Sequence, residues 1–433
     1  MGMIHKQNRN RIISVCMVCC LLVCGFRYLM RLTERKGGRD MTQELYDKGE
    51  EYDVLFVGSS HMIMGVSPMQ LWHEQGIPSY NMGRWGQWLP QNYYALEDAL
   101  AYAHPKLVVI DMLYFGEDRI GYTNDTAWNS SVHEVFDTIP LSVDKIRAIQ
   151  ELYPEDEKLR EGFLFKYSYY HNRWEELTEG DFARQSGYGV QKGGSLDARV
   201  VQPQSYERIP ADRMPEERTL GETYVNRMVD LCGEKGIPVL LVYIPHPATE
   251  AHQMGANAVY RYAQEKGVLY LNFLDLDVVD FQTDQMDEDS HLNALGARKV
   301  TTYLGNVIRT YYQLEDKRAD PAYADWNQAY QEFYQFKVDM LDTQTELKSY
   351  LMLCNDSDFM VKVVARPGLA LLEDPTIQKL LDGVDSVVVT DADLGTNVGV
   401  YIQVENRETG EVVSCKNFAD MVSVPEAEVY KNE

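Results

Sequence analysis

The sequence predicts a doubly wound α/β fold, in which a parallel sheet lies between two layers of helices. Several runs are apolar at every position instead of alternating, such as "DVLFVG" at 53–58 and "KLVVIDML" at 106–113. Runs of this kind are typical of strands that are buried on both faces. Segments with apolar residues at helical spacing separate them. Strands that alternate with helices favour right-handed crossovers within one sheet.

The expected elements follow one another from Tyr52 to Tyr312. Five strands are expected, in the runs "DVLFVG", "IPSYNMG", "KLVVIDML", "IPVLLVYIP" and "VLYLNFLDL". The helices between and after them are expected in "QNYYALEDALAYA", in "TLGETYVNRMVDLCGEKG", in a segment that ends at Gly267, and in "NALGARKVTTYLGNVIRTYY". Glycine directly after two of these segments is a typical helix stop.

Domain boundaries are predicted where this pattern starts, breaks and stops. We expect a cytoplasmic tail and transmembrane anchor in 1–40, the α/β domain in 52–315 with an insertion at 114–215, a connector in 316–345 and a small α+β domain in 346–433. Insertions at the carboxyl ends of strands tend to shape binding sites. The α+β domain is expected from the strand candidates "SYLMLC", "FMVKVV", "DSVVV" and "VGVYIQVEN" and the helical "DPTIQKLLDG".

The N-terminal segment is predicted to be a retained membrane anchor. Its apolar run, residues 12–26, is slightly short for a span of roughly 17–25 residues, but it lengthens if Arg27 snorkels to the interface. A cleaved signal peptide needs small residues at its cleavage site, and "GFRYLMR" has none. A lipoprotein anchor needs a small residue before its cysteine, whereas Val23 precedes Cys24. Basic residues are more numerous after the run than before it, so charge alone would place the body inside.

Composition excludes several classes of protein. The formal net charge is −25, which argues against a nucleic-acid partner, because duplex binding needs a concentrated basic face. Four of the seven cysteines lie in the anchor segment, and the other three form no disulfide framework. Intramembrane cysteine usually behaves as a small apolar residue. We therefore expect no metal and no cofactor.

Polar residues gather where the predicted strands end, and that edge of an open α/β sheet forms the functional crevice. These residues are Ser60 after the first strand, Gly83 and Gly86 after the second, Asp111 at the end of the third, and Asp289 and His291 before the last helix. Acyl transfer needs a hydroxyl nucleophile, an imidazole base and a carboxylate that orients the base. It also needs N–H donors for the oxyanion. Each part has a candidate at this edge.

These segments resemble the SGNH/GDSL hydrolase superfamily. "VGSSH" looks like the nucleophile block, with Ser60 in the serine position, and "NMGRWGQ" is similar to the second block. "DSHLNALGA" looks like the last block. The resemblance implies a flavodoxin-like sheet, Ser60 as nucleophile, His291 as base with Asp289 as its partner, and an oxyanion hole formed by Ser60 and Gly86.

Two departures from the family pattern are visible. Many members place the aspartate three residues before the histidine, where this chain has Glu288, whereas Asp289 lies two before. This spacing is similar to that of alginate O-acetyltransferase-like proteins. The third block normally supplies an asparagine donor, and "VVIDMLYFGED" contains none. Asp111 or Tyr114 is expected in its place, and an ionised Asp111 could not donate a hydrogen bond.

An anchor combined with "GSSH" and D-x-H resembles membrane-linked members that act in polymer O-acylation. These include teichoic-acid D-alanyl transfer proteins and alginate acetyltransferase relatives. The resemblance implies an extracytoplasmic body, a cell-envelope polysaccharide or acyl ester as substrate, and a membrane-bound O-acyltransferase as partner. His171 and Arg173 of "YHNRWEEL" are then expected to contact an acidic glycan or an acyl donor, as is Asp111. An intradomain ion pair of His171 or Arg173 with Glu175 or Glu176 is an equally good interpretation.

Each of these residues also has a structural interpretation. "GSSH" can be a strand-to-helix turn in which a serine caps the next helix, and Ser59 is a second nucleophile candidate. Asp289 can cap the last helix, Gly86 can be a turn glycine, and "DQMDED" at 284–289 is predicted to be a solvated turn and not a cation site. Taken together, the segments predict serine-dependent acyl transfer. The alternative is a catalytically inactive envelope scaffold or glycan-binding protein.

Overall fold

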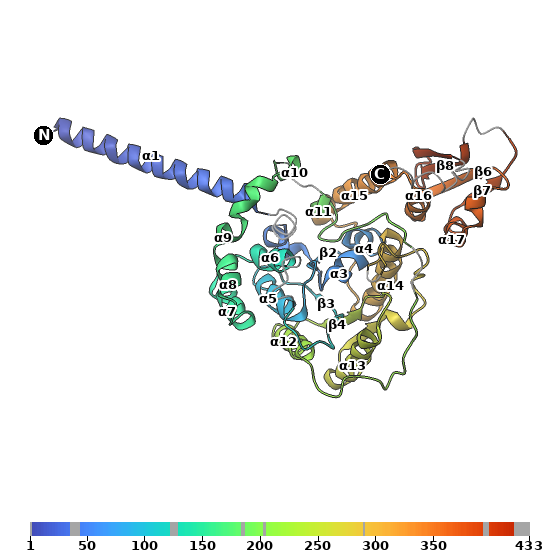
Figure 1. Cartoon of the computed structure of the whole chain (residues 1–433), viewed down its shortest axis with the longest axis horizontal. Coiled ribbons are helices and arrows are strands. Elements are labelled where there is room, and N and C mark those ends of the chain that lie inside the picture. Colours follow the sequence, from blue (N-terminus) through green and yellow to red (C-terminus); the bar gives the residue numbers. More distant parts are fainter. Residues whose placement is uncertain are drawn as a thin grey trace, which may run out of the picture.

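A computed structural model describes residues 2–34, 44–121, 129–182, 187–201, 205–288, 291–392 and 398–419. A long N-terminal helix projects from a layered α/β body, and a smaller sheet domain lies at the other end of the molecule (Figure 1). The long helix is α1 (Gly2–Thr33). The stretch Ile12–Thr33 is long and apolar enough to cross a membrane, and its residues from Ile12 to Leu29 are exposed.

The central sheet confirms the predicted fold class. Its five strands are all parallel, in the order β2-β1-β3-β4-β5, which is the flavodoxin-like order. They are β1 (Val54–Val57), β2 (Ser79–Asn81), β3 (Leu107–Asp111), β4 (Val239–Tyr243) and β5 (Leu269–Asn272). The first four are buried along their whole length.

Helices cover both faces of this sheet. Leu55, Val108 and Leu241 point to one face and pack with residues of α5, α12 and α13, while Phe56 and Val109 point to the other and pack with α3 and α14. The helices are α3 (Ser60–Gly65), α4 (Pro68–Gln75), α5 (Leu89–Ala99), α12 (Leu220–Glu234), α13 (Glu250–Lys266) and α14 (Ala294–Tyr312). Short 3-10 turns are η1 (Gly49–Glu51) and η3 (Phe273–Asp275). The site therefore rests on a core that is closed on both sides.

The predicted insertion is largely helical. It contains α6 (Asn129–Thr138), α7 (Val143–Leu152), α8 (Glu157–Leu164), α9 (Lys166–Tyr170), the 3-10 helix η2 (His171–Glu176), α10 (Glu179–Phe182) and α11 (Gly187–Val190). Three of these elements, α9, η2 and α10, pack against α1 (Figure 1). Part of the insertion therefore faces the anchor helix, while residues 193–201 run back to the carboxyl edge of the sheet.

The C-terminal part begins with α15 (Ala324–Thr343), after the 3-10 turn η4 (Pro321–Tyr323). Its four-stranded sheet has the order β7-β6-β8-β9, with β6 and β7 parallel and the other pairs antiparallel. The elements are α16 (Leu347–Cys354), β6 (Phe359–Ala365), η5 (Ala370–Glu373), α17 (Pro375–Asp382), β7 (Ser386–Val389), β8 (Val398–Asn406) and β9 (Val412–Ala419).

One predicted strand of this part, "SYLMLC", is wrong. These residues form most of α16, which is buried from Ser349 to Cys354 and packs against α15 and α17. A short run without polar positions fits a buried helix and a buried strand equally well, because periodicity distinguishes them only when polar residues mark the exposed face.

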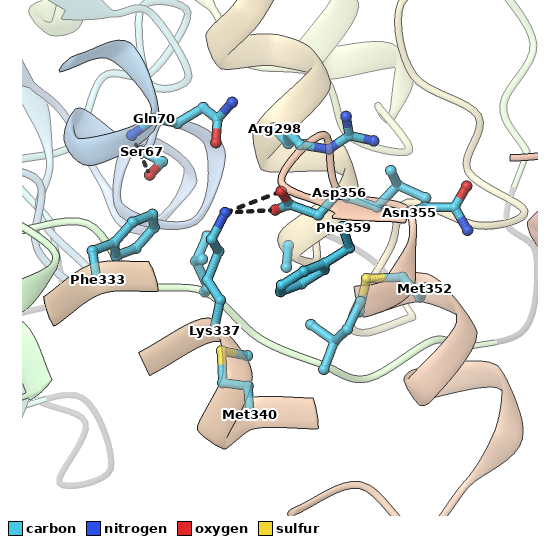
Figure 2. A pocket seen from close by; sticks show the side chains of 14 residues that line it. Ser67, Gln70, Arg298, Phe333, Lys337, Met340, Met352, Asn355, Asp356 and Phe359 are labelled. Carbon is cyan, nitrogen blue, oxygen red and sulfur yellow. Dashed lines mark hydrogen bonds and ion pairs between the residues drawn. The ribbon is translucent and has the colours of Figure 1, made fainter. Parts of the chain in front are cut away.

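A buried ionic cluster joins the two parts. Lys337 of α15 donates hydrogen bonds to both carboxylate oxygens of Asp356, at 3.0 Å each, and to Asp358 at 2.6 Å. Asp358 also lies 3.2 Å from Nε2 of His73 on α4. Figure 2 shows Lys337 and Asp356 beside a cavity of about 30 Å³ between the parts, with Ser67 and Gln70 on its other side. A cavity of that size holds about two water molecules, so this junction is packed and is not a substrate site.

Candidate active site

The turn after β1 is built around Ser59 and Asp111. The Ser59 hydroxyl caps α3 by accepting from the His61 N–H at 3.2 Å, and it donates to Oδ2 of Asp111 at 3.2 Å. A Cβ on Gly58 would lie 2.7 Å from the Cβ of Asp111, so the turn accepts only glycine there. Because Ser59 supplies the cap, the neighbouring serine is left available for other chemistry.

Ser60 meets His291 across the carboxyl edge of the sheet. Nε2 of His291 lies 2.8 Å from Oγ of Ser60, although the two residues are 231 positions apart in the chain. Ser60 is the first residue of α3, and His291 precedes α14. A hydroxyl and an imidazole at this distance form the nucleophile and base pair of serine-dependent acyl transfer.

The carboxylate at the other imidazole nitrogen belongs to Asp287, and the prediction of Asp289 needs correction. Oδ2 of Asp287 lies 2.5 Å from Nδ1 of His291, and its Oδ1 accepts from the His291 backbone N–H at 2.9 Å. Asp289 itself lies outside the described residues.

A hairpin explains why Asp287 takes this position. Gln285 and Leu292 form an antiparallel bridge, and the Met286 N–H bonds to the His291 carbonyl at 3.0 Å. The pairing sets Met286 opposite His291. Asp287 then reaches His291 because its Oδ1 accepts the His291 N–H four residues on, which brings its Oδ2 to Nδ1 of the ring. Spacing along the chain does not reveal this pairing. The "DQMDED" segment is therefore not simply a solvated turn, and its first residue, Asp284, is fully buried in an ion pair with Lys299 at 2.7 Å.

Asp111 lies beneath the nucleophile turn, where it holds the chain. It is 2% exposed, and it accepts hydrogen bonds from Ser59 and from the Leu113 N–H. Burial raises the pKa of Asp111 from 3.8 to about 6, although the hydrogen bonds from Ser59 and from the backbone of Leu113 and Ile244 act in the opposite direction. Its oxygens are bonded to the turn, so the geometry gives no support to the substrate contact of Asp111, which stays a prediction.

The loop after β2 closes over the site. The Gly83 N–H donates to Oδ1 of Asn81 at 3.0 Å, and the ring of Trp85 lies edge-on to the ring of His291, with centroids 5.0 Å apart. Gly86 has a φ of 63°, a left-handed conformation that favours glycine. A turn glycine and an oxyanion donor both fit this backbone, so the oxyanion role of Gly86 stays a prediction.

His171 and Arg173 do not line this site. The Arg173 guanidinium donates to the backbone carbonyls of Thr33 and Glu34 at 2.9 and 3.1 Å, and it pairs with Asp181 at 2.6 Å. Nδ1 of His171 lies 2.9 Å from the Ser168 carbonyl oxygen. Their segment is packed against α1 and not against the carboxyl edge of the sheet. The expected contact with a glycan or acyl donor is therefore replaced by a contact with the anchor helix, and the expected acidic partner is Asp181 in place of Glu175 or Glu176.

The returning end of the insertion supplies residues that the sequence did not single out. The Ser195 N–H bonds to the Ile63 carbonyl of α3 at 3.0 Å, and the Val201 N–H bonds to the Gln285 carbonyl at 3.2 Å. Between them, exposed Arg199 forms a two-point ion pair with Asp197. The negative charges of Asp197 and, to a smaller extent, Asp287 raise the pKa of Arg199. This segment therefore bridges the nucleophile helix and the base loop. No local motif marks it, because its role depends on where the insertion re-enters the fold.

Three further histidines surround the base. The ring of His61 is edge-on to those of His291 and His246, with centroids 5.2 and 4.6 Å apart. Nε2 of His246 lies 3.1 Å from Nδ1 of His252. Burial lowers the pKa of His61 well below 6.5 and that of His246 to about 3. These rings are therefore neutral, and His61 packs beside the site without serving as a charged base.

A larger hollow of about 720 Å³ opens beyond the ends of β4 and β5. Tyr206, Arg208, Pro245, Phe281 and Lys299 are among its lining residues, while Ser60 and His291 are not. Its lining mixes aromatic rings with charged groups. The hollow is thus a separate feature of the same edge of the sheet.

Comparisons with known proteins find only distant structural likenesses. No family model matches it, and no curated protein matches it. A solved structure from Desulfitobacterium hafniense, named as a lipolytic protein of the G-D-S-L family, is 15% identical, with a TM-score of 0.31 over 59% of this chain and 98% of its own. One from Bacteroides fragilis, named as an acylhydrolase, is 11% identical, with a TM-score of 0.33 over 64% of this chain and 100% of its own. Likenesses this weak do not identify a reaction, which depends on the geometry of the site.

Proposed function

We propose that the protein is a serine-dependent esterase or acyltransferase that acts through an acyl-Ser60 intermediate. The observation that carries the proposal is the continuous chain from Ser60 Oγ through both nitrogens of His291 to Asp287. The carboxylate fixes the ring with a proton on Nδ1, which leaves Nε2 free to accept the proton of the hydroxyl.

In the first half-reaction, Ser60 Oγ attacks the carbonyl carbon of an ester while its proton passes to Nε2 of His291. Asp287 stabilises the imidazolium that forms. The oxyanion needs N–H donors, and the Ser60 N–H is suited to this role because the first N–H groups of a helix have no partner within the helix. We assign the second donor to the Gly86 N–H. When the tetrahedral intermediate collapses, His291 returns the proton to the departing alkoxide, and an alcohol leaves.

In the second half-reaction, a hydroxyl attacks the acyl-Ser60 carbonyl and gives its proton to His291. Water as the attacker yields a carboxylic acid, and a sugar hydroxyl yields a new ester. In both cases Ser60 leaves and regains the proton from His291. The same groups serve both reactions, so the placement of the acceptor and the exclusion of water decide between them.

The proposed setting is the cell envelope. The apolar stretch Ile12–Thr33 supports a single membrane anchor. The extracytoplasmic placement of the body rests on the sequence resemblance. The open hollow of about 720 Å³ lies on the same edge of the sheet and has room for a large acceptor such as a polysaccharide, although neither Ser60 nor His291 lines it. A membrane-bound O-acyltransferase as the partner rests on the sequence resemblance alone.

A catalytically inactive scaffold is the second candidate. The observation in its favour is Asp111, which lies near the position where the family resemblance implies an asparagine donor. Asp111 carries a carboxylate instead, and its oxygens accept hydrogen bonds from Ser59 and Leu113 of the turn. A lost donor costs about 10²–10³-fold in rate and does not abolish catalysis. A scaffold does not need Ser60, His291 and Asp287 to be aligned in this way, so we favour the enzyme.

Hydrolysis of p-nitrophenyl acetate by the full chain in detergent tests the proposal. We expect turnover by the wild type and a loss of about 10³-fold or more in Ser60→Ala. Ser59→Ala is the matched control, since it removes the neighbouring hydroxyl and the cap but not the nucleophile. Equal activities of wild type and Ser60→Ala would favour the scaffold.

A further inference from the structure

The body of the protein touches α1 where the apolar run ends. Residues of α1 from Ile12 to Leu29 are exposed, Met30 is half-buried and Thr33 is 7% exposed. The ring of Tyr167 on α9 lies 5.3 Å from that of Phe26, a residue near the end of the run. A helix that crosses a bilayer core of about 30 Å needs about 20 residues, which from Ile12 reaches Arg31. The contact between body and anchor therefore falls at the level where a membrane surface would lie.

Cations fix this junction. The Arg173 guanidinium occupies the backbone carbonyls of Thr33 and Glu34 at the end of α1, which have no partner within the helix. Asp181 of α10 holds the same guanidinium from the other side at 2.6 Å, and Lys166 of α9 lies 3.7 Å from the Glu34 carboxylate. These contacts orient α9, η2 and α10 relative to the anchor and leave little freedom for a hinge.

The same three elements expose large aromatic side chains. Phe165, just before α9, is 68% exposed, Trp174 of η2 is 62% exposed and Phe182 of α10 is 64% exposed. Such side chains usually lie in a core. Trp is enriched at the level of lipid headgroups, and Trp and Phe are typical of the apolar faces of helices that lie at a membrane interface. Glu175, Glu176 and Glu179 are exposed on the same elements, and the whole chain carries a net charge of −25. Electrostatic attraction to anionic lipids would therefore not bind this surface to a membrane.

We infer that Phe165, Trp174 and Phe182 form an aromatic membrane-contact surface that inserts into the headgroup layer of the bilayer that α1 crosses. The inference rests on the membrane anchoring proposed above. Its occupant is lipid, because α1 is fixed beside these rings and its apolar stretch has no other cover within the described residues. The surface would keep the α/β body at a fixed height and orientation above the membrane, so that Ser60 meets ester substrates made or held at that membrane.

Quenching of tryptophan fluorescence by brominated lipid tests this inference. The full chain is reconstituted into phosphatidylcholine vesicles with and without brominated acyl chains, as wild type and as Trp174→Phe. Bromine quenches only indoles close to the acyl chains. We expect clear quenching in the wild type and a loss of most of it in Trp174→Phe. Trp85→Phe, which removes an indole beside the active site, is the matched control and should leave the quenching unchanged.

Equal quenching of wild type and Trp174→Phe would overturn the inference. Flotation of the same vesicles keeps this result separate from a failure of anchoring, since a chain without an anchor would not float with them. Hydrolysis of p-nitrophenyl acetate reports on the proposed activity independently. A second variant, Phe182→Glu, should increase hydrogen exchange in peptides that cover 165–182 in vesicles, whereas Tyr311→Glu, at an equally exposed ring on α14, should not. Unchanged exchange in Phe182→Glu would also contradict the surface.

Discussion

Two clusters of ionisable groups in this molecule both contain histidine and aspartate, but they differ in how completely their members are paired by hydrogen bonds. At the carboxyl edge of the sheet, Asp287, His291 and Ser60 form an open chain that ends in a hydroxyl. Between the two parts of the protein, Lys337 and Asp358 belong to a closed network in which each charge has several partners.

The closed cluster contains groups with strongly shifted pKa values. Burial alone would lower the pKa of Lys337, yet Asp356 and Asp358 outweigh it and raise that pKa above 10.5. The pKa of Asp358 falls well below 3.8, since His73, Lys337 and Tyr330 outweigh the opposing effect of burial. Perturbed ionisation often marks functional sites, but structural ion networks produce it too. The comparison teaches that the size of a pKa shift does not identify the reactive cluster here. A hydroxyl within hydrogen-bond distance of an imidazole base does.

The largest expected effect comes from the carboxylate of the open cluster. Asp287→Asn should lower the kcat for p-nitrophenyl acetate by about 10²–10⁴-fold, because an amide can hold His291 in the wrong tautomer and cannot stabilise its charged form. Asp289→Asn, two residues away, should change kcat by less than about twofold. Steady-state kinetics of both variants check the assignment. A large loss in Asp289→Asn with normal activity in Asp287→Asn would reverse it.

In the closed cluster, a change should affect stability and leave catalysis intact. Lys337→Met leaves two buried carboxylates without their cation, and breaking a buried pair costs about 3–5 kcal/mol. Urea unfolding of the full chain in detergent measures this loss. The control is Lys48→Met, which removes an exposed pair with Asp325 and should cost less than about 1 kcal/mol. If Lys337→Met abolished turnover at full stability, the distinction between the clusters would be lost.

Asp111 should show the smallest effect, confined to a pH window. Its pKa is raised from 3.8 to about 6 in the folded protein, so between these values the folded state binds more protons than the unfolded state. Stability then falls as pH rises from about 4 to 6, by about 3 kcal/mol from this group. Asp111→Asn should remove that part of the slope. Urea unfolding at pH 4, 5 and 6.5 measures it, and identical slopes for both proteins would contradict the raised pKa.

Much of the fold was predictable because burial on both faces leaves a direct mark on sequence. Uniformly apolar runs located the parallel strands, and parallel strands place their carboxyl ends at one edge. That rule alone was sufficient to expect Ser60 near His291, although 231 positions separate them. The helix α16 was mistaken for a strand because its residues carry no polar marker of a face.

What remained hidden depends on contacts that spacing does not encode. Asp287 reaches His291 by accepting the His291 backbone N–H with one oxygen and meeting the ring nitrogen with the other, a geometry that a family spacing does not encode. Arg173 bonds to the end of α1 about 140 positions away and to Asp181, and neither partner could be identified from its local sequence. In both cases the residue type was informative, while its partner required the folded chain.

Covalent labelling tests the central claim most directly. A fluorophosphonate reacts with a serine only where a base activates it, and trypsin releases both candidate serines in the peptide 49–84. We predict a single adduct on Ser60 in the wild type, the same adduct in Ser59→Ala, and none in Ser60→Ala or His291→Ala. An adduct on Ser59, or equal labelling of wild type and Ser60→Ala, would contradict the account.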